Sequence, residues 1–137
     1  MENKFAIAIK CVVYHKKKIL LLVKTDEERK DDAVDSSWDL PGGRIQYGES
    51  AEDAVYREIY EETSLKVNTL VLKSTNTVIR PDGLHLLILL FKCVCDSNKV
   101  MISNEHSAFH WLEIEEIKEQ KSIPDWIKDS INVVEES

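Results

Sequence analysis

Apolar residues alternate with polar ones along several stretches of the chain, and residues typical of turns bound these stretches. This alternation predicts strands, because successive side chains of a strand point to opposite faces. The pattern predicts strands over five ranges: Phe5 to His15, Ile19 to Lys24, Val67 to Ile79, Leu84 to Cys95 and Ala108 to Leu112. The apolar run Leu84 to Phe91 has the length of a strand that is buried on both faces.

Turn and loop residues separate the predicted strands. Residues 16–17 predict a polar turn between the first two strands, and residues 81–83 predict a turn between the third and fourth. The charged segment Thr25 to Ser37 predicts a loop, which would be the flexible insert of the domain. The stretch Pro41 to Gly43 is typical of a tight turn that leads from a strand into a loop.

The spacing of apolar residues becomes helical from Ser50 to Glu62. Ala51, Val55 and Ile59 recur every four residues, which places them on one face of a helix. The succession of strands and helices predicts one domain, residues 1–137, of the α/β class with a mixed sheet. Two shorter helical patterns follow the last strand, over Glu113 to Gln120 and Pro124 to Val134.

Composition and charge limit the partners of this domain. The chain is 43% apolar and 31% charged, as in an ordinary globular protein, and its longest apolar run is too short to span a membrane. A net charge of −7 repels a phosphate backbone, so we expect no non-specific binding of nucleic acid. Met1 to Lys4 lead directly into a strand pattern rather than a hydrophobic leader, and we expect a cytoplasmic protein.

Three cysteines, Cys11, Cys93 and Cys95, lie within the predicted strands. Cys93 and Cys95 are two residues apart, so they project from the same face. A metal or redox pair is one interpretation, but no CxxC motif accompanies it. We interpret all three as buried, reduced thiols, because free cysteine is among the most often buried residue types.

Three glutamates occupy an unusual position on the predicted helix Ser50 to Glu62. Glu58 and Glu62 fall within the apolar stripe, between Ala54 and Val55, and Glu61 lies at its edge. A run of glutamates is ordinarily a solvated face of a helix. That interpretation fits poorly here, because a solvated face does not coincide with the apolar one.

A bound cation explains this placement better. Glu58 and Glu62 are one helical turn apart and repel each other, close to the helix end where the backbone dipole is also negative. Each effect costs about 0.3–1 kcal/mol at an exposed site, and a divalent cation reverses the sign of both. Oxygen-rich ligands suit Mg²⁺ or Mn²⁺. The sequence therefore favours a Mg²⁺ or Mn²⁺ site over a structural cluster of charges.

The residues before the helix fit the same hypothesis. Gly42 and Gly43 lack side chains, so their backbone can come close to a ligand, although a simple tight turn would also use them. Glu49 precedes the helix and can reach Arg57, and a charge-assisted hydrogen bond between them would fix the loop to the helix.

Gly43, Glu49 and the segment Arg57 to Leu65 together resemble the Nudix box, G-x5-E-x7-R-E-U-x-E-E-x-G-U, in which U is a bulky aliphatic residue. Six of its seven polar or glycine positions match, and the exception is Ser64, where the box has its second glycine. A non-glycine residue in the left-handed conformation at a helix end costs about 1–2 kcal/mol.

The resemblance implies an α/β/α sandwich that hydrolyses a nucleoside diphosphate linked to another group, X. It implies that Glu58 and Glu62 bind the essential divalent metals. Glu61 would bind metal or help to activate water, and the Gly43 carbonyl would complete the coordination. Such metals neutralise pyrophosphate oxygens and lower the pKa of a bound water.

The resemblance also assigns supporting roles. Arg57 and Glu49 would hold the geometry of loop and helix rather than do chemistry. The family draws its general base from the box or from a later loop, and our candidate outside the box is Glu105, in a polar loop before the last predicted strand. An ordinary surface acid is the other interpretation of Glu105. We interpret His106 and His110 as ordinary polar positions rather than a metal pair.

Aromatic residues are candidates for base recognition, because bases are held by stacking and by hydrogen bonds to their edges. Each of these candidates also fits a place in the core or at the rim of the site. A proline sixteen positions past Leu65 lies near the place where ADP-ribose-cleaving relatives carry one, but its neighbours make a turn the simpler interpretation. The aromatic candidates are Trp38, Tyr14, Phe5 and Tyr47.

These observations predict a pyrophosphohydrolase that depends on Mg²⁺ or Mn²⁺. Its substrate would be a nucleoside triphosphate or a related small nucleotide, cleaved to a nucleoside monophosphate and pyrophosphate or phosphorylated X. One alternative is a pyrophosphatase of ADP-ribose or of a nucleotide sugar. An alternative of another class is a catalytically silent nucleotide-sensing module, although a mere binding module has no need of three metal-placed carboxylates. The chain would act as a monomer or as a homodimer.

Overall fold

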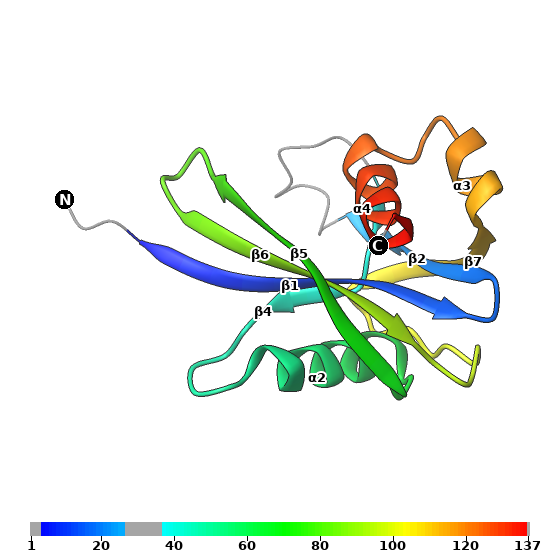
Figure 1. Ribbon diagram of the computed structural model, residues 1–137, viewed down its shortest axis with the longest axis horizontal. Coiled ribbons are helices and arrows are strands. Elements are labelled where there is room, and N and C mark those ends of the chain that lie inside the picture. Colours follow the sequence, from blue (N-terminus) through cyan, green and yellow to red (C-terminus); the bar gives the residue numbers. More distant parts are fainter. Residues whose placement is uncertain (1–3, 27–36, 137) are drawn as a thin grey trace.

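The computed structural model describes residues 4–26 and 37–136 (Figure 1). All predicted strands and helices are present within these ranges, and their bounds differ from the predicted ones by at most two residues. The strands are β1 (Phe5–His15), β2 (Lys18–Lys24), β3 (Trp38–Asp39), β4 (Gly42–Arg44), β5 (Thr69–Ile79), β6 (His85–Val94) and β7 (His106–Glu113), and the helices are α2 (Ala51–Thr63), α3 (Ile114–Glu119) and α4 (Asp125–Glu135).

In the described part of the chain the strands form one seven-stranded sheet, with the central order β3-β2-β1-β6-β5. β1 and β6 run parallel, with Phe5 opposite His85 and Tyr14 opposite Val94. The other strand pairs are antiparallel. β4 pairs with β1 and β7 pairs with β2, so β1 has neighbours along both of its edges. The predicted mixed sheet is confirmed.

Helices cover both faces of this sheet (Figure 1). On one face, Val55 and Ile59 of α2 pack with Ile9 and Cys11 of β1. On the other face, α3 and α4 pack against the alternate residues of β1, such as Val12. The alternation along β1 therefore divides its side chains between two cores. This arrangement confirms the α/β/α sandwich.

Gly42 and Gly43 form part of strand β4 and not the turn that the sequence predicts. Gly42 lies opposite Lys10 and Gly43 lies opposite Ile9. A Cβ atom at Gly42 would collide with the carbonyl oxygen of Ile9, so a glycine is required for β4 to lie this close to β1. A strand of three residues that contains two glycines has no alternation of apolar and polar side chains, and the pattern therefore does not predict it.

Strand β6 is less buried than its apolar sequence indicates. Leu90, Phe91 and Cys93 are buried, but residues 85–89 are only half-buried. This end of the β5–β6 hairpin extends away from the helices on both faces of the sheet (Figure 1). The prediction of a strand buried on both faces is therefore wrong for its first half.

The cysteines confirm the interpretation as reduced thiols, because Cys11, Cys93 and Cys95 are all free and buried. The predicted loop Thr25 to Ser37 falls mostly on residues 27–36, which lie outside the described residues. Among the residues that the structure describes, no helix has both the length and the apolar character needed to cross a membrane.

Helix α2 has a side-chain cap at its start and a left-handed residue at its end. The Ser50 hydroxyl accepts a hydrogen bond from the N–H of Asp53 at 3.1 Å. Ser64 has a φ of 64°, in the left-handed region, and its N–H donates to the Tyr60 carbonyl at 2.8 Å. The Ser64 hydroxyl also donates to the carbonyl of Met101 at 3.4 Å. The helix thus ends where the glycine of the Nudix box would stand, without a glycine.

Candidate functional site

Arg57 fastens the loop before α2 to the helix. Its Nε donates to Glu49 Oε2 at 2.6 Å and its Nη2 donates to Glu49 Oε1 at 2.9 Å, which makes a bidentate ion pair. Nη2 also donates to the carbonyl of Arg44 at 3.2 Å. The hydrogen bonds from Arg57 lower the pKa of Glu49 to about 2. The ion pair that the sequence predicts is therefore present.

Glu58 lies directly against β4. Its Oε1 accepts a hydrogen bond from Arg57 Nη1 at 2.8 Å, and its side chain is 14% exposed. A Cβ atom at Gly43 would lie 2.6 Å from the carboxyl carbon of Glu58. Gly43 therefore leaves a space for this carboxylate beside the backbone of β4. A metal site formed by this carboxylate and the Gly43 carbonyl would need such a space.

Glu62 is the most buried carboxylate of α2, with 3% of its surface exposed. Its Oε1 accepts a hydrogen bond from the N–H of Gly42 at 2.9 Å. Burial raises the pKa of Glu62 to about 8, and the negative charges of Glu58 and Asp39 act in the same direction. The Gly42 N–H and the Lys10 ammonium oppose this rise without cancelling it. A divalent cation would supply the missing positive charge.

Glu61 faces the solvent at the edge of this group. Its side chain is 57% exposed, and its Oε2 accepts a hydrogen bond from Arg57 Nη1 at 3.3 Å. The helix therefore directs Glu58 and Glu62 toward β4 and leaves Glu61 at the rim, which is the distribution that the helical spacing predicts.

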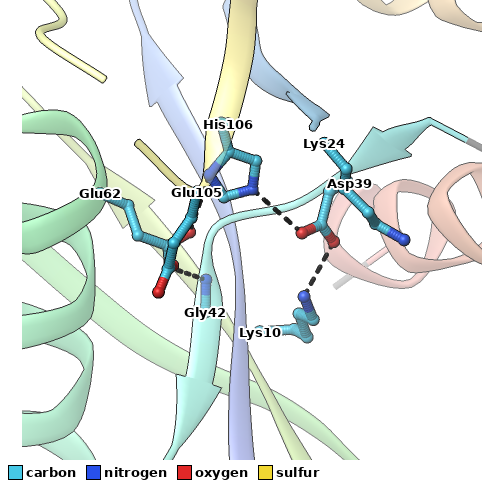
Figure 2. A pocket seen from close by; sticks show the side chains of 7 residues that line it. All are labelled: Lys10, Lys24, Asp39, Gly42, Glu62, Glu105 and His106. Carbon is cyan, nitrogen blue, oxygen red and sulfur yellow. Dashed lines mark hydrogen bonds and ion pairs between the residues drawn. The ribbon is translucent and has the colours of Figure 1, made fainter. Parts of the chain in front are cut away.

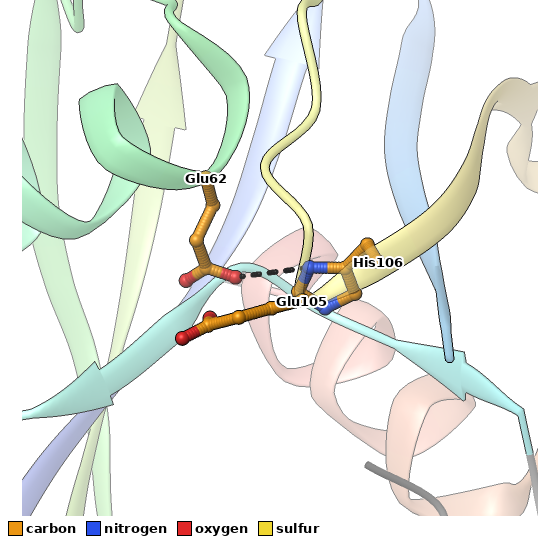
Figure 3. A group of neighbouring side chains, drawn as sticks. All are labelled: Glu62, Glu105 and His106. Atoms are coloured by element: carbon orange, nitrogen blue, oxygen red, sulfur yellow. Dashed lines mark ion pairs between the residues drawn. The ribbon is translucent and has the colours of Figure 1, made fainter. Parts of the chain in front are cut away.

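The loop before β7 and the first residue of this strand bring two more side chains to Glu62. This loop is tied to the end of α2, because the N–H of Met101 donates to the Thr63 carbonyl at 2.9 Å and the N–H of Ser103 donates to the Glu62 carbonyl at 3.1 Å. One ligand atom from each of Glu62, Glu105 and His106 lies within 4.8 Å of the other two (Figure 3). The structure thus places Glu105 beside Glu62 of α2.

His106 is not the ordinary polar position that the sequence suggests. It is buried beside Glu62, whereas His110, farther along β7, is exposed. One feature of the sequence could have indicated that His106 belongs to the site, because it directly follows Glu105, the candidate general base. A histidine at the start of a predicted strand can point to either face, and the sequence does not decide between them.

Lys10 and Asp39 are two further residues of the site that sequence reasoning missed. Lys10 Nζ lies 2.9 Å from Asp39 Oδ1 and donates to the Leu40 carbonyl at 3.1 Å. Although burial opposes the change, Lys10 and His106 lower the pKa of Asp39 to about 2. A lysine inside the apolar strand β1, and an acid just before the Pro-Gly-Gly stretch, were the signals that could have identified them.

These side chains surround a polar cavity of about 190 Å³ (Figure 2). Glu62 and Glu105 contribute acidic groups on one side, and Lys10 contributes an ammonium group on another. The cavity can therefore receive a cation that lies next to an anion, such as a metal ion bound to a phosphate group. The residues that line it are Lys10, Lys24, Asp39, Gly42, Glu62, Glu105 and His106.

The aromatic candidates for base recognition are scattered, and none of them lines this cavity. Tyr14 is buried in the core beneath α4, and its hydroxyl donates to Glu135 at 2.6 Å. Phe5 and Tyr47 are exposed. Trp38 donates a hydrogen bond to Ser122 at 3.0 Å. The structure therefore does not bring these aromatic residues together.

The donor set fits a divalent cation. The carboxylates of Glu58 and Glu62 lie at the glycines of β4, and the Nδ1 atom of His106 is buried without a hydrogen-bond partner. Oxygen-rich sites of this kind suit Mg²⁺ and Mn²⁺. Glu58, Glu61, Glu62 and the Gly43 carbonyl are the groups that could hold the metal.

Two known proteins are similar to this chain over more than half of its length. The ADP-ribose pyrophosphatase of Methanocaldococcus jannaschii is 35% identical over 88 residues, which are 63% of this chain and 48% of that protein. The Bacillus subtilis protein named "Putative 8-oxo-dGTP diphosphatase" is 52% identical over 101 residues, which are 74% of this chain and 62% of that protein.

A solved structure shares the fold along nearly the whole chain. The MutT protein of Methanosarcina mazei Go1 superposes with a TM-score of 0.79 at 22% identity and covers 99% of this chain and 97% of that one. The family model of the NUDIX domain matches residues 4–132. Since this match includes the box, the sandwich and the loop of Glu105, the chain belongs to the Nudix family of hydrolases, which act on phosphoric anhydride bonds.

Proposed function

We propose that this chain is a divalent-metal-dependent pyrophosphohydrolase that cleaves a nucleoside triphosphate to a nucleoside monophosphate and pyrophosphate. The observation that carries the proposal is the meeting of Glu62 with Glu105 beside Gly42, one helical turn from Glu58 at Gly43. The similarity to the protein named as an 8-oxo-dGTP diphosphatase supports a nucleoside triphosphate as the substrate.

Glu58, Glu61, Glu62 and the carbonyl of Gly43 would hold Mg²⁺ or Mn²⁺. When bound, such an ion neutralises phosphate oxygens and makes a water molecule more acidic. The clamp between Arg57 and Glu49 fixes the start of α2, so the helix presents Glu58 and Glu62 toward β4 in one orientation. Orientation of this kind lowers the barrier to attack on phosphorus, because the reacting atoms are already in line.

Glu105 and Glu61 are the two candidates for accepting a proton from the attacking water. Both carboxylates are exposed, so each can meet a water molecule at the rim. Glu105 also lies beside Glu62, within 4.8 Å between their ligand atoms. This position favours Glu105 as the general base, with Glu61 at the other edge of the site.

Lysines of the cavity favour an anionic substrate. The chain as a whole carries a net charge of −7, so binding of a polyphosphate needs local positive charge. Lys10 and Lys24 both line the cavity that contains Glu62 and Glu105. Phosphate groups would lie between these ammonium groups and the metal held by the glutamates.

The test is a hydrolysis assay on a panel of nucleotides with Mg²⁺ or Mn²⁺. The panel contains the ordinary and 8-oxo nucleoside triphosphates, ADP-ribose and nucleotide sugars, and the products are separated by chromatography. Pyrophosphate from a triphosphate supports the proposal, whereas turnover confined to ADP-ribose or to a nucleotide sugar would replace it with the alternative enzyme. Nucleotide binding without turnover of any compound would favour the silent sensing module.

Two variants of the same helix control this assay. Glu62→Gln removes the buried carboxylate, and Glu52→Gln makes the same chemical change on the exposed first turn of α2. Activity that belongs to this site is lost in the first variant and kept in the second. A cytoplasmic location and a homodimer stay predictions, and light scattering of the purified chain distinguishes a dimer from a monomer.

A further inference from the structure

His106 occupies a position that the proposed metal site does not yet explain. The residue is 7% exposed, and its ring lies between two carboxylates (Figure 2). Nε2 lies 3.3 Å from Asp39 Oδ2, and Nδ1 lies 3.6 Å from Glu62 Oε2. Nδ1 is buried and has no hydrogen-bond partner. Buried nitrogen atoms without a partner are rare in folded proteins, so we expect Nδ1 of His106 to contact a ligand.

Asp39 and Glu62 lie on opposite sides of the His106 ring. Lys10 Nζ lies 2.9 Å from Asp39 Oδ1 and fixes the position of this side chain beside the ring. Asp39 Oδ2 lies 3.3 Å from His106 Nε2, and in the tautomer with its hydrogen on Nε2 this nitrogen donates to Asp39. The other nitrogen, Nδ1, then presents its lone pair toward Glu62. A carboxylate behind a histidine is the usual support of a histidine that binds a metal.

The contact between Nδ1 and Glu62 is too long for a hydrogen bond. Nδ1 and Glu62 Oε2 are 3.6 Å apart, which exceeds the range of a hydrogen bond and leaves room for an atom between them to draw both groups together. Nδ1 and the carboxyl group of Glu62 face each other in a buried place without a hydrogen bond between them. A positive ion between them satisfies both groups.

We propose that His106 Nδ1 joins Glu62 and Glu105 as a ligand of one divalent cation, with Lys10 and Asp39 as the residues that hold the ring. The proposal rests on the metal-dependent function above and adds a nitrogen donor to it. The three donor atoms lie within 4.8 Å of one another, and the exposed side chain of Glu105 can close that distance by rotation (Figure 3).

A nitrogen donor changes which metal this position prefers. Mg²⁺ takes oxygen ligands, whereas Mn²⁺, Co²⁺ and Zn²⁺ also accept imidazole. The position at His106 therefore favours a transition-metal ion over Mg²⁺. Glu58, Glu61 and the Gly43 carbonyl offer only oxygen, so a metal held by them keeps the preference for Mg²⁺. We therefore expect the position formed by Glu62, Glu105 and His106 to bind Mn²⁺ more tightly than Mg²⁺, because His106 supplies a nitrogen ligand.

The direct test is pulsed electron paramagnetic resonance on the full chain loaded with less than one equivalent of Mn²⁺ and no nucleotide. A directly bound imidazole gives a hyperfine coupling to ¹⁴N, and protein labelled with ¹⁵N-histidine replaces this signal with that of ¹⁵N. We expect the coupling in the wild type and in His110→Gln, and its loss in His106→Gln. His110 is an exposed histidine of the same strand and serves as the matched control.

Calorimetric titration supplies an independent measurement. His106→Gln is expected to weaken Mn²⁺ binding by about tenfold or more and to leave Mg²⁺ binding nearly unchanged, since loss of a supporting group already costs about tenfold. His110→Gln should change neither. The spectrum of labelled wild-type protein needs no variant, so the proposal stays testable even if His106→Gln does not fold.

The outcomes separate this proposal from the proposed function. If Mn²⁺ binds to the wild-type protein and the spectrum shows no coupling to histidine nitrogen, the role of His106 as a direct ligand is overturned. His106 would then contact the metal only through a water molecule. Failure of Mn²⁺ to bind at all would overturn the role as well. In both cases the nucleotide panel with Mg²⁺ still decides the proposed function, because that assay does not depend on a nitrogen ligand.

Discussion

Glu62 shows how a single side chain can be destabilising for the fold and necessary for the site. Its carboxylate is buried at the end of α2, where Gly42 gives it one hydrogen bond at 2.9 Å. Burial and the nearby Glu58 both disfavour its negative charge. A folded chain accepts this cost where a cation is to be bound, because the same charge then becomes favourable.

Glu62→Gln is therefore expected to separate activity from stability. The change should lower kcat by about 100-fold or more, since even residues behind a metal ligand contribute about 10–100-fold. Tm in the presence of EDTA should stay the same or rise, because the amide cannot take on a negative charge in this buried place beside Glu58. Kinetic assays and thermal unfolding of the same preparation measure both. Near-normal turnover would show that Glu62 does not hold the metal.

Ser64 presents the opposite case, a residue whose backbone is strained but whose side chain is dispensable. It has a φ of 64° at the end of α2, where a glycine would be relaxed. We expect Ser64→Gly to leave the free energy of unfolding unchanged or to raise it by up to about 1 kcal/mol, with kcat unaffected. Urea denaturation checks this. A clear loss of stability would mean that the hydroxyl contact with Met101 secures the helix end.

Helix α2 acts as a unit because both of its ends are fixed. At the start, Arg57 binds Glu49 through two hydrogen bonds of 2.6 and 2.9 Å. At the end, backbone hydrogen bonds join Glu62 and Thr63 to the loop of residues 101–105. The helix thereby holds its own carboxylates against β4 and also holds the loop that carries Glu105.

Weakening the ion pair between Arg57 and Glu49 should make the geometry of the site less well fixed without removing any metal ligand. In Glu49→Gln, the bidentate ion pair to Arg57 becomes a single neutral contact, and we expect a lower Tm and a higher metal concentration for half-maximal activity. The loss in kcat should be smaller than that of Glu62→Gln. Metal titrations of activity measure this, with Glu52→Gln as the control. A loss equal to that of Glu62→Gln would assign Glu49 a part in the chemistry.

Elements with long patterns were predictable from the sequence, and close contacts between distant segments were not. The spacing of Ala51, Val55 and Ile59 gave both α2 and the inward position of its glutamates. Strand β4 escaped because two glycines carry no pattern, and His106 escaped because its neighbour Glu62 is far away in sequence. Register and strand order decide such contacts, and they are set by the whole fold rather than by local spacing.

In the whole molecule, the sheet separates the two helix layers, and each layer packs into its own core. The site lies where α2 meets β4. The layer of α4 is fastened to β1 by the hydroxyl of Tyr14, which donates to Glu135 Oε2 at 2.6 Å. Burial, the hydrogen bond to Glu135 and its charge raise the pKa of Tyr14 above the ordinary value of tyrosine. The folded chain therefore keeps Tyr14 neutral at a pH where an unfolded chain ionises it.

This shift gives a stability that depends on pH. The contribution of Tyr14 is fully present below about pH 10, the ordinary pKa of tyrosine, and is lost as the pH rises from there toward the raised pKa. Tyr14→Phe should lower the free energy of unfolding by about 1–2 kcal/mol at pH 8 and by less at pH 11. Urea denaturation at both values measures the difference. The control Tyr56→Phe, on the exposed face of α2, should show no such change.

The central claim is that this fold is a metal-dependent pyrophosphohydrolase, and pyrophosphate release from nucleoside triphosphates tests it most directly. The measurement compares the purified chain with Mg²⁺ or Mn²⁺, the same chain with EDTA, and Glu62→Gln with the metal. We predict pyrophosphate and nucleoside monophosphate only in the first case. No pyrophosphate from any nucleoside triphosphate with either metal, or equal release in the presence of EDTA, would contradict the claim.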